Sequence, residues 1–178
     1  MTQPHPTSAD LERAIRNIPD FPQPGIQFKD ITPVLADARL FSGSIDLLTQ
    51  NFRPGMVDTV VGIDARGFIF AAAAAVKLQA GFVPVRKKGK LPYQTLEQTY
   101  DLEYGTNTVA IHVDALKPGS RVLLIDDLIA TGGTAAAAAT LVRNIGGRIL
   151  ETSFLIELGF LNGREKLKGY PVRALVKY

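Results

Sequence analysis

The chain has 178 residues, of which 46% are hydrophobic, and this length and composition fit a single domain, 1–178, with a buried core. Its formal net charge of +3 comes from 20 basic and 17 acidic residues spread along the chain, so the sequence does not demand a nucleic-acid partner. The absence of cysteine excludes disulfides, thiolate metal sites and a cysteine nucleophile. No apolar stretch has membrane-spanning length and the N-terminus lacks a signal pattern, so we expect a cytosolic protein with no membrane partner.

The N-terminal region predicts an arm followed by a short helix. Residues 1–7 are polar and contain proline, which is typical of a frayed arm. The segment 8–35 then begins with a helix that is capped by Ser8 and ended by Pro19. Its apolar residues share one face: Leu11, Ile15 and Ile18. Two prolines make 21–25 irregular.

Further along the chain, predicted strands and helices alternate. The expected helices are 40–51, 68–79 and 134–145, and the expected strands are 59–63, 82–86, 121–125, 149–157 and 172–176. This order predicts an α/β fold with a doubly wound, mostly parallel sheet flanked by helices. Two alanine runs, 71–75 and 135–139, would let their helices pack close to the sheet.

A polar insertion, 87–107, interrupts this alternation. It carries glycine, proline and tyrosine residues rather than a periodic apolar pattern. Insertions of this size in a compact domain are commonly lids or binding loops. We therefore expect a lid whose ends pair as a short hairpin.

The most informative segment reads VLLIDDLIATGGT, from Val122 to Thr134. A continuous apolar run, 122–125, is typical of a parallel strand that is buried on both faces. Asp126 and Asp127 follow at its carboxyl end, where open α/β sheets bind ligands. The small residues after them would let backbone N–H groups approach an anion, and the next helix points its positive end at the same place. The pattern predicts a phosphate site without a lysine in the loop.

Two other phosphate-binding loops are excluded. A Walker loop needs lysine after its last glycine, but Gly133 is followed by Thr134, and no GxGxxG occurs in the chain. A phosphate would repel the two carboxylates, so we expect them to bind sugar hydroxyls or a magnesium shell. The alternative is that the acids only cap the following turn.

A second turn, DARG at 64–67, follows the predicted strand 59–63. Its N–H groups and the planar guanidinium of Arg66 could bind pyrophosphate. The alternative is a surface pair between Arg66 and Asp64. A basic run follows the next strand, and such runs are usually solvated, although one or two of its members could clamp an anion.

These motifs resemble the phosphoribosyl diphosphate (PRPP) signature of type I phosphoribosyltransferases. Five further segments resemble the adenine phosphoribosyltransferases of that superfamily: FPQPGIQFKDITPVL, GIDARGF, RKKGKLP, LEYG and ELGFLNGREKL. The resemblance as a whole covers nearly everything after the first ten residues. The resemblance implies transfer of phosphoribosyl from PRPP to adenine N9, giving AMP and pyrophosphate, with Mg²⁺ held mainly by PRPP and with a homodimer.

The resemblance also implies roles for individual residues. Asp126 and Asp127 would hold the ribose hydroxyls, and the PRPP phosphate would lie on Ala130, Thr131, Gly132, Gly133 and Thr134. The pyrophosphate residues would be Ala65, Arg66, Lys87 and Lys90, with Arg66 also catalytic. Adenine would contact Gln27, Phe28, Lys29 and Leu158. In the lid, Tyr100 and Tyr104 would cover the site, and Glu103 would handle the proton of the base.

Two positions depart from the family pattern. The family more often has glutamate at the position of Asp64, and many relatives carry arginine at the position of Lys29. The two histidines, His5 and His112, are too far apart in sequence to suggest a metal site.

Two competing functions remain open at this point. One is a phosphoribosyltransferase of the same fold that acts on another purine base. The other is a regulator that binds PRPP as an effector and acts on nucleic acid. Such a regulator would need a basic recognition element, for which the first helix offers only Arg13 and Arg16.

Overall fold

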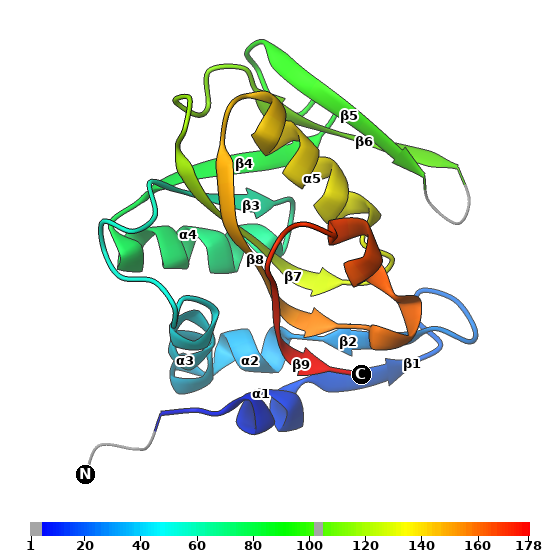
Figure 1. The fold of residues 1–178 in the computed structure, drawn as a ribbon. Helices are drawn as coiled ribbons and strands as arrows, with labels where there is room; N and C mark the ends of the chain where they lie inside the picture. Colours follow the sequence, from blue (N-terminus) through cyan, green and yellow to red (C-terminus); the bar gives the residue numbers. More distant parts are fainter. Residues whose placement is uncertain (1–4, 102–104) are drawn as a thin grey trace. The chain divides into compact units, whose positions relative to one another are not determined.

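The computed structural model describes residues 5–101 and 105–178 (Figure 1). The chain forms two compact units, Met1–Leu47 and Leu48–Tyr178, and each is described by itself. Among the described residues, no helix combines the length and the apolar character needed to cross a bilayer.

The N-terminal unit contains short helices and a two-stranded ribbon. Its elements are α1 (Ser8–Ala14), β1 (Arg16–Pro19), β2 (Gln27–Asp30) and α2 (Thr32–Ala36), and α3 (Ala38–Leu48) ends just beyond it. Strand β1 pairs antiparallel with β2. The predicted irregular segment 21–25 lies in the connection between these two strands.

The first helix was predicted too long. It ends at Ala14, and Ile18 lies in β1 opposite Phe28 rather than on the apolar face of the helix. The residue that caps the helix is Thr7, which forms a reciprocal capping box with Asp10. Strand pairing with β2, which the local pattern does not reveal, replaces the last predicted turn of helix.

The C-terminal unit is built on a seven-stranded sheet. Its strands are β3 (Thr59–Ile63), β4 (Gly81–Lys87), β5 (Thr95–Asp101), β6 (Thr106–His112), β7 (Arg121–Ile129), β8 (Arg148–Glu157) and β9 (Val172–Lys177). Their order is β5-β6-β4-β3-β7-β8-β9. Neighbours from β4 to β9 pair in parallel, whereas β6 pairs antiparallel with β4 and with β5. The predicted mostly parallel α/β sheet is confirmed.

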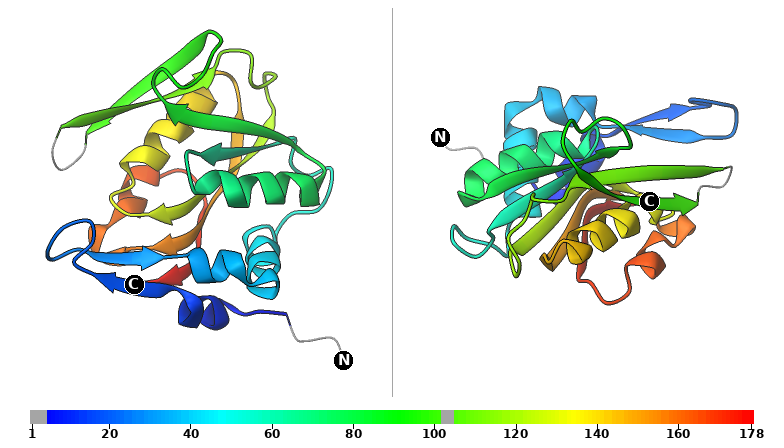
Figure 2. Two further views of the ribbon diagram at one scale, coloured as in Figure 1. Left: turned by 180° about the vertical axis from the view of Figure 1, so that it is seen from behind. Right: turned by 90° about the horizontal axis from the view of Figure 1, so that it is seen from above.

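Two long helices cover opposite faces of this sheet (Figure 2). Helix α4 (Gly67–Leu78) follows β3, and α5 (Gly133–Asn144) follows β7. The alanines of α5 pack in one core cluster with alternate residues of the strands, including Val61, Ile63, Val122 and Leu124. Small side chains on both helices allow the close approach to the sheet that the alanine runs predict.

The order in which the chain adds strands to the sheet reverses between β3 and β7. From β3 the chain passes through α4 to β4 on one side, and from β7 it passes through α5 to β8 on the other side. A crevice forms at such a switch point, outside the carboxyl ends of the two central strands. This topology brings the 64–67 turn and the 130–134 loop to adjacent strand ends.

The insertion forms an edge of the same sheet. Strands β5 and β6 pair over their full length, from Thr95–His112 to Asp101–Thr106, and β6 also pairs with the end of β4 at Arg86 and Lys87. The ends of the insertion therefore pair as predicted, and the paired region is longer than a short hairpin. Residues 102–104 at its tip lie outside the described residues.

Candidate active site

One cavity of about 320 Å³ opens at the switch point. It is lined by Ile63, Asp64, Ala65, Arg66, Lys87, Tyr100, Asp126, Asp127, Leu128, Ile129, Ala130, Thr131, Gly132, Gly133, Thr134 and Ala135. The two turns that the sequence assigns to pyrophosphate and to phosphate thus share one cavity. A single ligand can reach both.

The phosphate loop lies between the end of β7 and the start of α5. Gly132 caps the helix in the left-handed region, with φ of 77°, and its carbonyl accepts the N–H of Ala136 at 2.9 Å. A helix of 12 residues begins at Gly133, so its positive end faces the cavity. This geometry is suited to an anion, as the sequence predicts.

The strand before the loop is longer than predicted. Strand β7 extends to Ile129 rather than ending at Ile125, because it keeps its parallel pairing with β8 as far as Glu157. Asp126 and Asp127 therefore lie within the strand itself instead of after it. The sheet, rather than a loop, fixes the backbone of both acids.

The two carboxylates have different environments. Asp127 is buried, and its Oδ2 lies 2.6 Å from Nε of Arg66. Asp126 accepts the backbone N–H of Asp127 on its Oδ1 at 2.9 Å. Burial, reinforced by the charge of Asp127, raises the pKa of Asp126 well above its usual value. Burial also raises the pKa of Asp127, although the Arg66 guanidinium opposes that effect.

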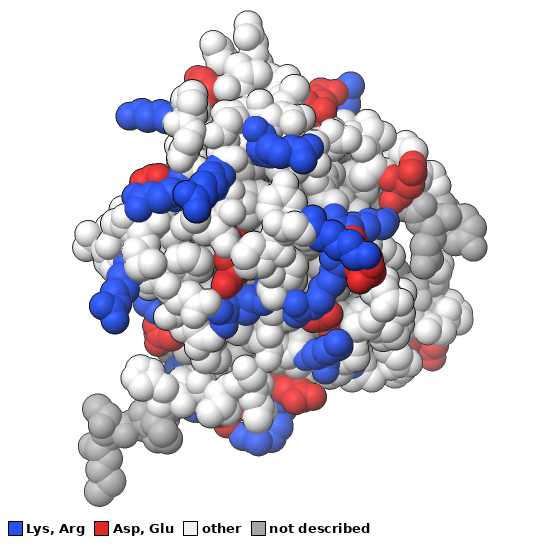
Figure 3. Space-filling view, viewed as in Figure 1, with Lys and Arg blue, Asp and Glu red and all other residues white. Residues whose placement is uncertain are grey.

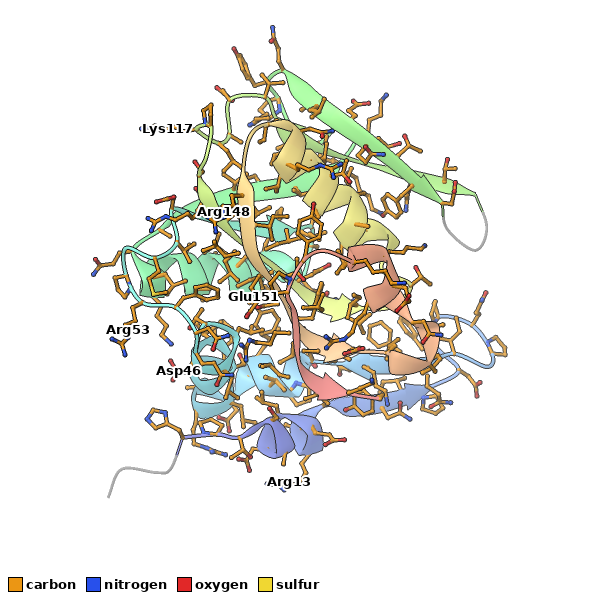
Figure 4. All side chains as sticks on the ribbon, in the orientation of Figure 1. Arg13, Asp46, Arg53, Lys117, Arg148 and Glu151 are labelled. Atoms are coloured by element: carbon orange, nitrogen blue, oxygen red, sulfur yellow. The ribbon has the colours of Figure 1, made fainter. Side chains whose placement is uncertain are left out.

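A buried acid outside the cavity provides a contrast. Glu151, labelled in Figure 4, accepts hydrogen bonds from Arg173, Ser153 and Asn51. Burial raises the pKa of Glu151, but these bonds outweigh burial and hold the pKa below its usual value. A buried acid with a raised pKa in a cavity is a candidate for binding chemistry, whereas a fully bonded acid such as Glu151 serves the fold.

The pyrophosphate turn is organised by two ion pairs. Arg66, at the start of α4, pairs with Asp127 across the cavity. Asp64 instead accepts Nε of Arg86 at 2.9 Å. The alternative pairing of Arg66 with Asp64 is therefore wrong, because Arg86 on the neighbouring strand β4 occupies that carboxylate. The peptide between Asp64 and Ala65 is cis.

The basic residues at and after the end of β4 have different environments. Lys87 lines the cavity. Lys88 pairs with Glu97 at 2.7 Å, and Arg86 also donates to the backbone carbonyl of Lys90. Among the described residues, Lys90 is not one of those that line the cavity.

Figure 3 shows basic and acidic side chains interspersed over one face of the molecule, as the spread of charge along the sequence suggests.

The edge hairpin reaches the phosphate loop through Tyr100. The hydroxyl of Thr134 donates to the hydroxyl of Tyr100 at 2.9 Å. The Tyr100 ring also packs on Gly133, since a Cβ there would lie 3.0 Å from ring atom Cδ2. Glu103 and Tyr104, the other lid residues predicted from the sequence, lie outside the described residues.

The predicted adenine residues belong to different elements. Gln27, Phe28 and Lys29 form most of β2 in the N-terminal unit. The Phe28 ring makes an edge contact with Phe21, with 5.1 Å between ring centroids. Leu158, at the end of β8, donates its N–H to the carbonyl of Ile129 and is half-buried. Their role in binding the base stays a prediction.

Sequence reasoning missed the support behind the phosphate loop. A Cβ on Gly132 would overlap the carbonyl oxygen of Gly163, and a Cβ on Gly163 would overlap the carbonyl oxygen of Ala130. The loop therefore rests directly on the backbone of η2 (Gly163–Leu167), a short 3-10 helix. The only signal was the segment ELGFLNGREKL, which contributed to the resemblance without a predicted structure.

Comparison with known proteins gives a consistent result. The family model of the phosphoribosyl transferase domain matches residues 31–173. The adenine phosphoribosyltransferase of Thermobifida fusca is 56% identical over 165 residues, which cover 93% of this chain and 94% of the relative.

Solved structures agree with the sequence relatives. The adenine phosphoribosyltransferase of Rhodothermus marinus superposes with a TM-score of 0.91 at 53% identity, covering 96% of this chain and 98% of that one. The Saccharomyces cerevisiae enzyme, complexed with D-2,5-dideoxy-2,5-imino-altritol 1,6-bisphosphate and adenine, gives a TM-score of 0.89 at 42% identity, covering 94% and 97%. With this cavity and these relatives, the chain belongs to the adenine phosphoribosyltransferase family.

Proposed function

We propose that this chain transfers the 5-phosphoribosyl group of PRPP to N9 of adenine, releasing AMP and pyrophosphate. The observation that carries the proposal is the shared cavity, which joins an anion-binding loop, two acids and an arginine turn. A ligand with a phosphate at one end, ribose hydroxyls in the middle and a diphosphate at the other end matches that order. The relatives supply the choice of adenine.

The phosphate and the ribose would be held by the β7 side of the cavity. The N–H groups of 130–134 and the hydroxyls of Thr131 and Thr134 would bind the 5-phosphate. Asp126 and Asp127 would accept the 2- and 3-hydroxyls of the ribose. Hydroxyl donors at Asp126 would stabilise the ionised form of an acid that burial otherwise disfavours.

The diphosphate would lie on the β3 side of the cavity. The turn at Ala65 and Arg66 would supply backbone N–H groups and guanidinium donors, and Lys87 would add a positive charge. Arginine has five N–H donors, so Arg66 can serve a diphosphate oxygen while its Nε stays on Asp127. Lys90 remains a weaker candidate, because it is outside the set of residues that line the cavity.

Catalysis would consist mainly of positioning and charge neutralisation. Breaking the bond at C1 of the ribose produces an oxocarbenium-like centre, and the departing diphosphate gains charge that Arg66 and Lys87 face. The hairpin that carries Tyr100 would exclude water from that centre. Glu103 would handle the proton of the base at N7 or N9.

Magnesium would enter with PRPP. In the described part of the chain, no three His, Cys, Asp or Glu residues lie close enough together to hold a metal. Asp126 and Asp127, which line the cavity, would help to hold a cation that the substrate mainly ligates. When bound, Mg²⁺ supplies positive charge to the diphosphate.

Three further features are part of the proposal. Adenine would contact Gln27, Phe28, Lys29 and Leu158, and a homodimer is the expected assembly. The cytosolic location that the sequence predicts is tested by fractionation of the source cells, and the assembly by light scattering of the purified protein.

The decisive experiment is a panel of bases with PRPP and Mg²⁺. We expect AMP and pyrophosphate from adenine, with hypoxanthine, guanine and xanthine at least about a hundredfold less efficient in kcat/KM, because a buried polar group left unpaired costs about 3 kcal/mol. Fast turnover of another purine would assign the same site to a different base. Binding of PRPP without turnover of any base would support the regulatory alternative.

A further inference from the structure

We propose that Arg164 is a positioning residue for the phosphate loop, residues 130–134. Its guanidinium binds Glu157, and the neighbouring backbone of Gly163 contacts the loop. It touches neither the cavity nor the expected substrate. The inference rests on the proposed function, because it assigns the loop to the 5-phosphate of PRPP.

The segment that supports the loop cannot fix its own position. Residues 159–167 form two short 3-10 helices, η1 (Gly159–Leu161) and η2, and neither has a side-chain cap. Hydrogen bonds in 3-10 helices have poor geometry, so such a segment depends on outside anchors. On one side, the anchor is Leu167, which is buried in the core cluster with the alanines of α5.

The anchor on the other side is the ion pair of Arg164 with Glu157. Nε of Arg164 lies 2.8 Å from both carboxylate oxygens, and a second guanidinium nitrogen lies 2.7 Å from Oε2. Glu157 is the last residue of β8, and its side chain is only 7% exposed. The two-nitrogen contact of Arg164 therefore ties η2 to the end of β8, a strand paired on both sides in the sheet.

Gly163, the residue before Arg164, makes the backbone contact with the phosphate loop. Gly163 precedes Arg164, and its position leaves no room for a Cβ against Ala130. Its carbonyl in turn leaves no room for a Cβ on Gly132, which is the helix cap of the loop. A shift of η2 would thus move the amides of 130–132 directly, because there is no gap to absorb it.

The consequence is a role in substrate binding at a distance. Anion binding by backbone amides depends on their geometry, and a displacement of about 1 Å can cost a large factor in function. Losing Arg164 would loosen the loop before PRPP binds. The diphosphate end of the cavity, built on β3 and α4, would keep its geometry.

The test compares Arg164→Gln and Arg164→Lys with the wild type. For Arg164→Gln, we expect KM for PRPP to rise about tenfold, with kcat and KM for adenine within about twofold. Arg164→Lys keeps the positive charge but loses the planar guanidinium. We therefore expect its KM for PRPP to rise by only about threefold, which is half of the tenfold change on a logarithmic scale. The dissociation constant of ribose 5-phosphate, measured by calorimetry, should rise in parallel with KM for PRPP.

A matched control is Lys168, the residue that follows η2. Lys168 pairs with Glu165 at 2.5 Å, but both side chains are exposed and the pair does not reach β8. Lys168→Gln should leave KM for PRPP and the ribose 5-phosphate affinity within about twofold of wild type. A general effect of losing an ion pair in η2 would appear in both variants.

The outcomes separate this inference from the proposed function. A wild type that makes AMP, together with a folded Arg164→Gln protein whose ribose 5-phosphate affinity is unchanged, would overturn the role of Arg164 alone. If Arg164→Gln does not fold, Arg164→Lys decides, and an unchanged KM for PRPP then overturns it. A wild type without turnover would refute the proposed function, while ribose 5-phosphate binding would still test the inference.

Discussion

The hydroxyl of Thr134 in the phosphate loop donates a hydrogen bond to the hydroxyl of Tyr100 on the edge hairpin, at 2.9 Å. If Thr134 turns its proton to a phosphate oxygen, Tyr100 can donate to Thr134 in exchange. The two hydroxyls then form a chain in which each bond polarises the next. This pair links the lid to the occupancy of the loop.

Tyr100→Phe should remove that chain and keep the ring packing on Gly133. We expect KM for PRPP to rise about fivefold, which corresponds to about 1 kcal/mol for one hydrogen bond. Thr134→Ala should cost a similar amount, and the double variant little more. Steady-state kinetics of the four proteins measure the coupling, and fully additive losses would show that the pair does not act as a unit.

Asp126→Asn should stabilise the substrate-free protein and impair its activity. The folded state raises the pKa of Asp126, so its ionisation is a cost that grows as pH rises from the ordinary value near 3.8. The asparagine variant avoids that cost, and we expect about 1 kcal/mol of added stability at neutral pH. The advantage should shrink as the pH is lowered and wild-type Asp126 becomes protonated. Urea unfolding at pH values from about 4 to about 8 measures it.

The same variant should lose about thirtyfold in kcat/KM for PRPP, since charged hydrogen bonds to the ribose hydroxyls contribute about 2 kcal/mol. Asp127→Asn is the matched control. It breaks the pair with Arg66, so it should show no gain in stability. Stabilisation by Asp127→Asn, or destabilisation by Asp126→Asn at neutral pH, would contradict these assignments.

Arg66→Lys should affect the diphosphate end of the cavity selectively. Lysine has a single ammonium group, so it cannot replace both the Nε contact of Arg66 with Asp127 and a planar fork to an oxyanion. In the reverse reaction, from AMP and pyrophosphate, we expect KM for pyrophosphate to rise about tenfold. Affinity for ribose 5-phosphate should stay within about twofold of wild type. An equal loss of affinity for pyrophosphate and for ribose 5-phosphate would argue against separate binding sites for the two at opposite ends of the cavity.

Gly132→Ala should be far more harmful than alanine at another glycine with the same backbone. Gly132 and Gly119 have φ of 77° and 79°, so both substitutions carry a similar conformational cost of about 1 kcal/mol. Only at Gly132 would the new Cβ overlap the carbonyl of Gly163, since nothing lies within 4 Å of the Cβ position at Gly119. We expect Gly132→Ala to abolish ribose 5-phosphate binding and Gly119→Ala to leave it intact. Calorimetry and thermal unfolding of both variants test the difference.

The elements of the sheet could be predicted from sequence because their signals are local. The apolar run ahead of Asp126 and the alanines that follow Gly133 each fix an element and its approximate ends. The boundary of β7 at Ile129 could not be predicted in this way, since it depends on pairing with β8. The same holds for β1, where pairing with β2 takes Ile18 from the predicted helix.

The residues that line the cavity were easier to predict than the side chains with which they pair. Residues 64–66 and 130–134 were expected to meet, and they share the cavity. The pairing of Arg66 with Asp127 and of Asp64 with Arg86 joins residues far apart in sequence, so no spacing rule reveals it. The support of Gly132 by Gly163 is a backbone contact, for which the sequence gives only two glycines.

The pairing of β3 with β7 sets the length of ligand that can reach both the 64–67 turn and the 130–134 loop. Neighbouring strands of a sheet lie about 4.8 Å apart, and this spacing is set by main-chain hydrogen bonds rather than by side chains. The gap between the 64–67 turn and the 130–134 loop is therefore nearly independent of the side chains around it. Substitutions in the cavity could change which base accepts the phosphoribosyl group. The length of the donor molecule would stay fixed by the hydrogen-bonded pairing of β3 with β7.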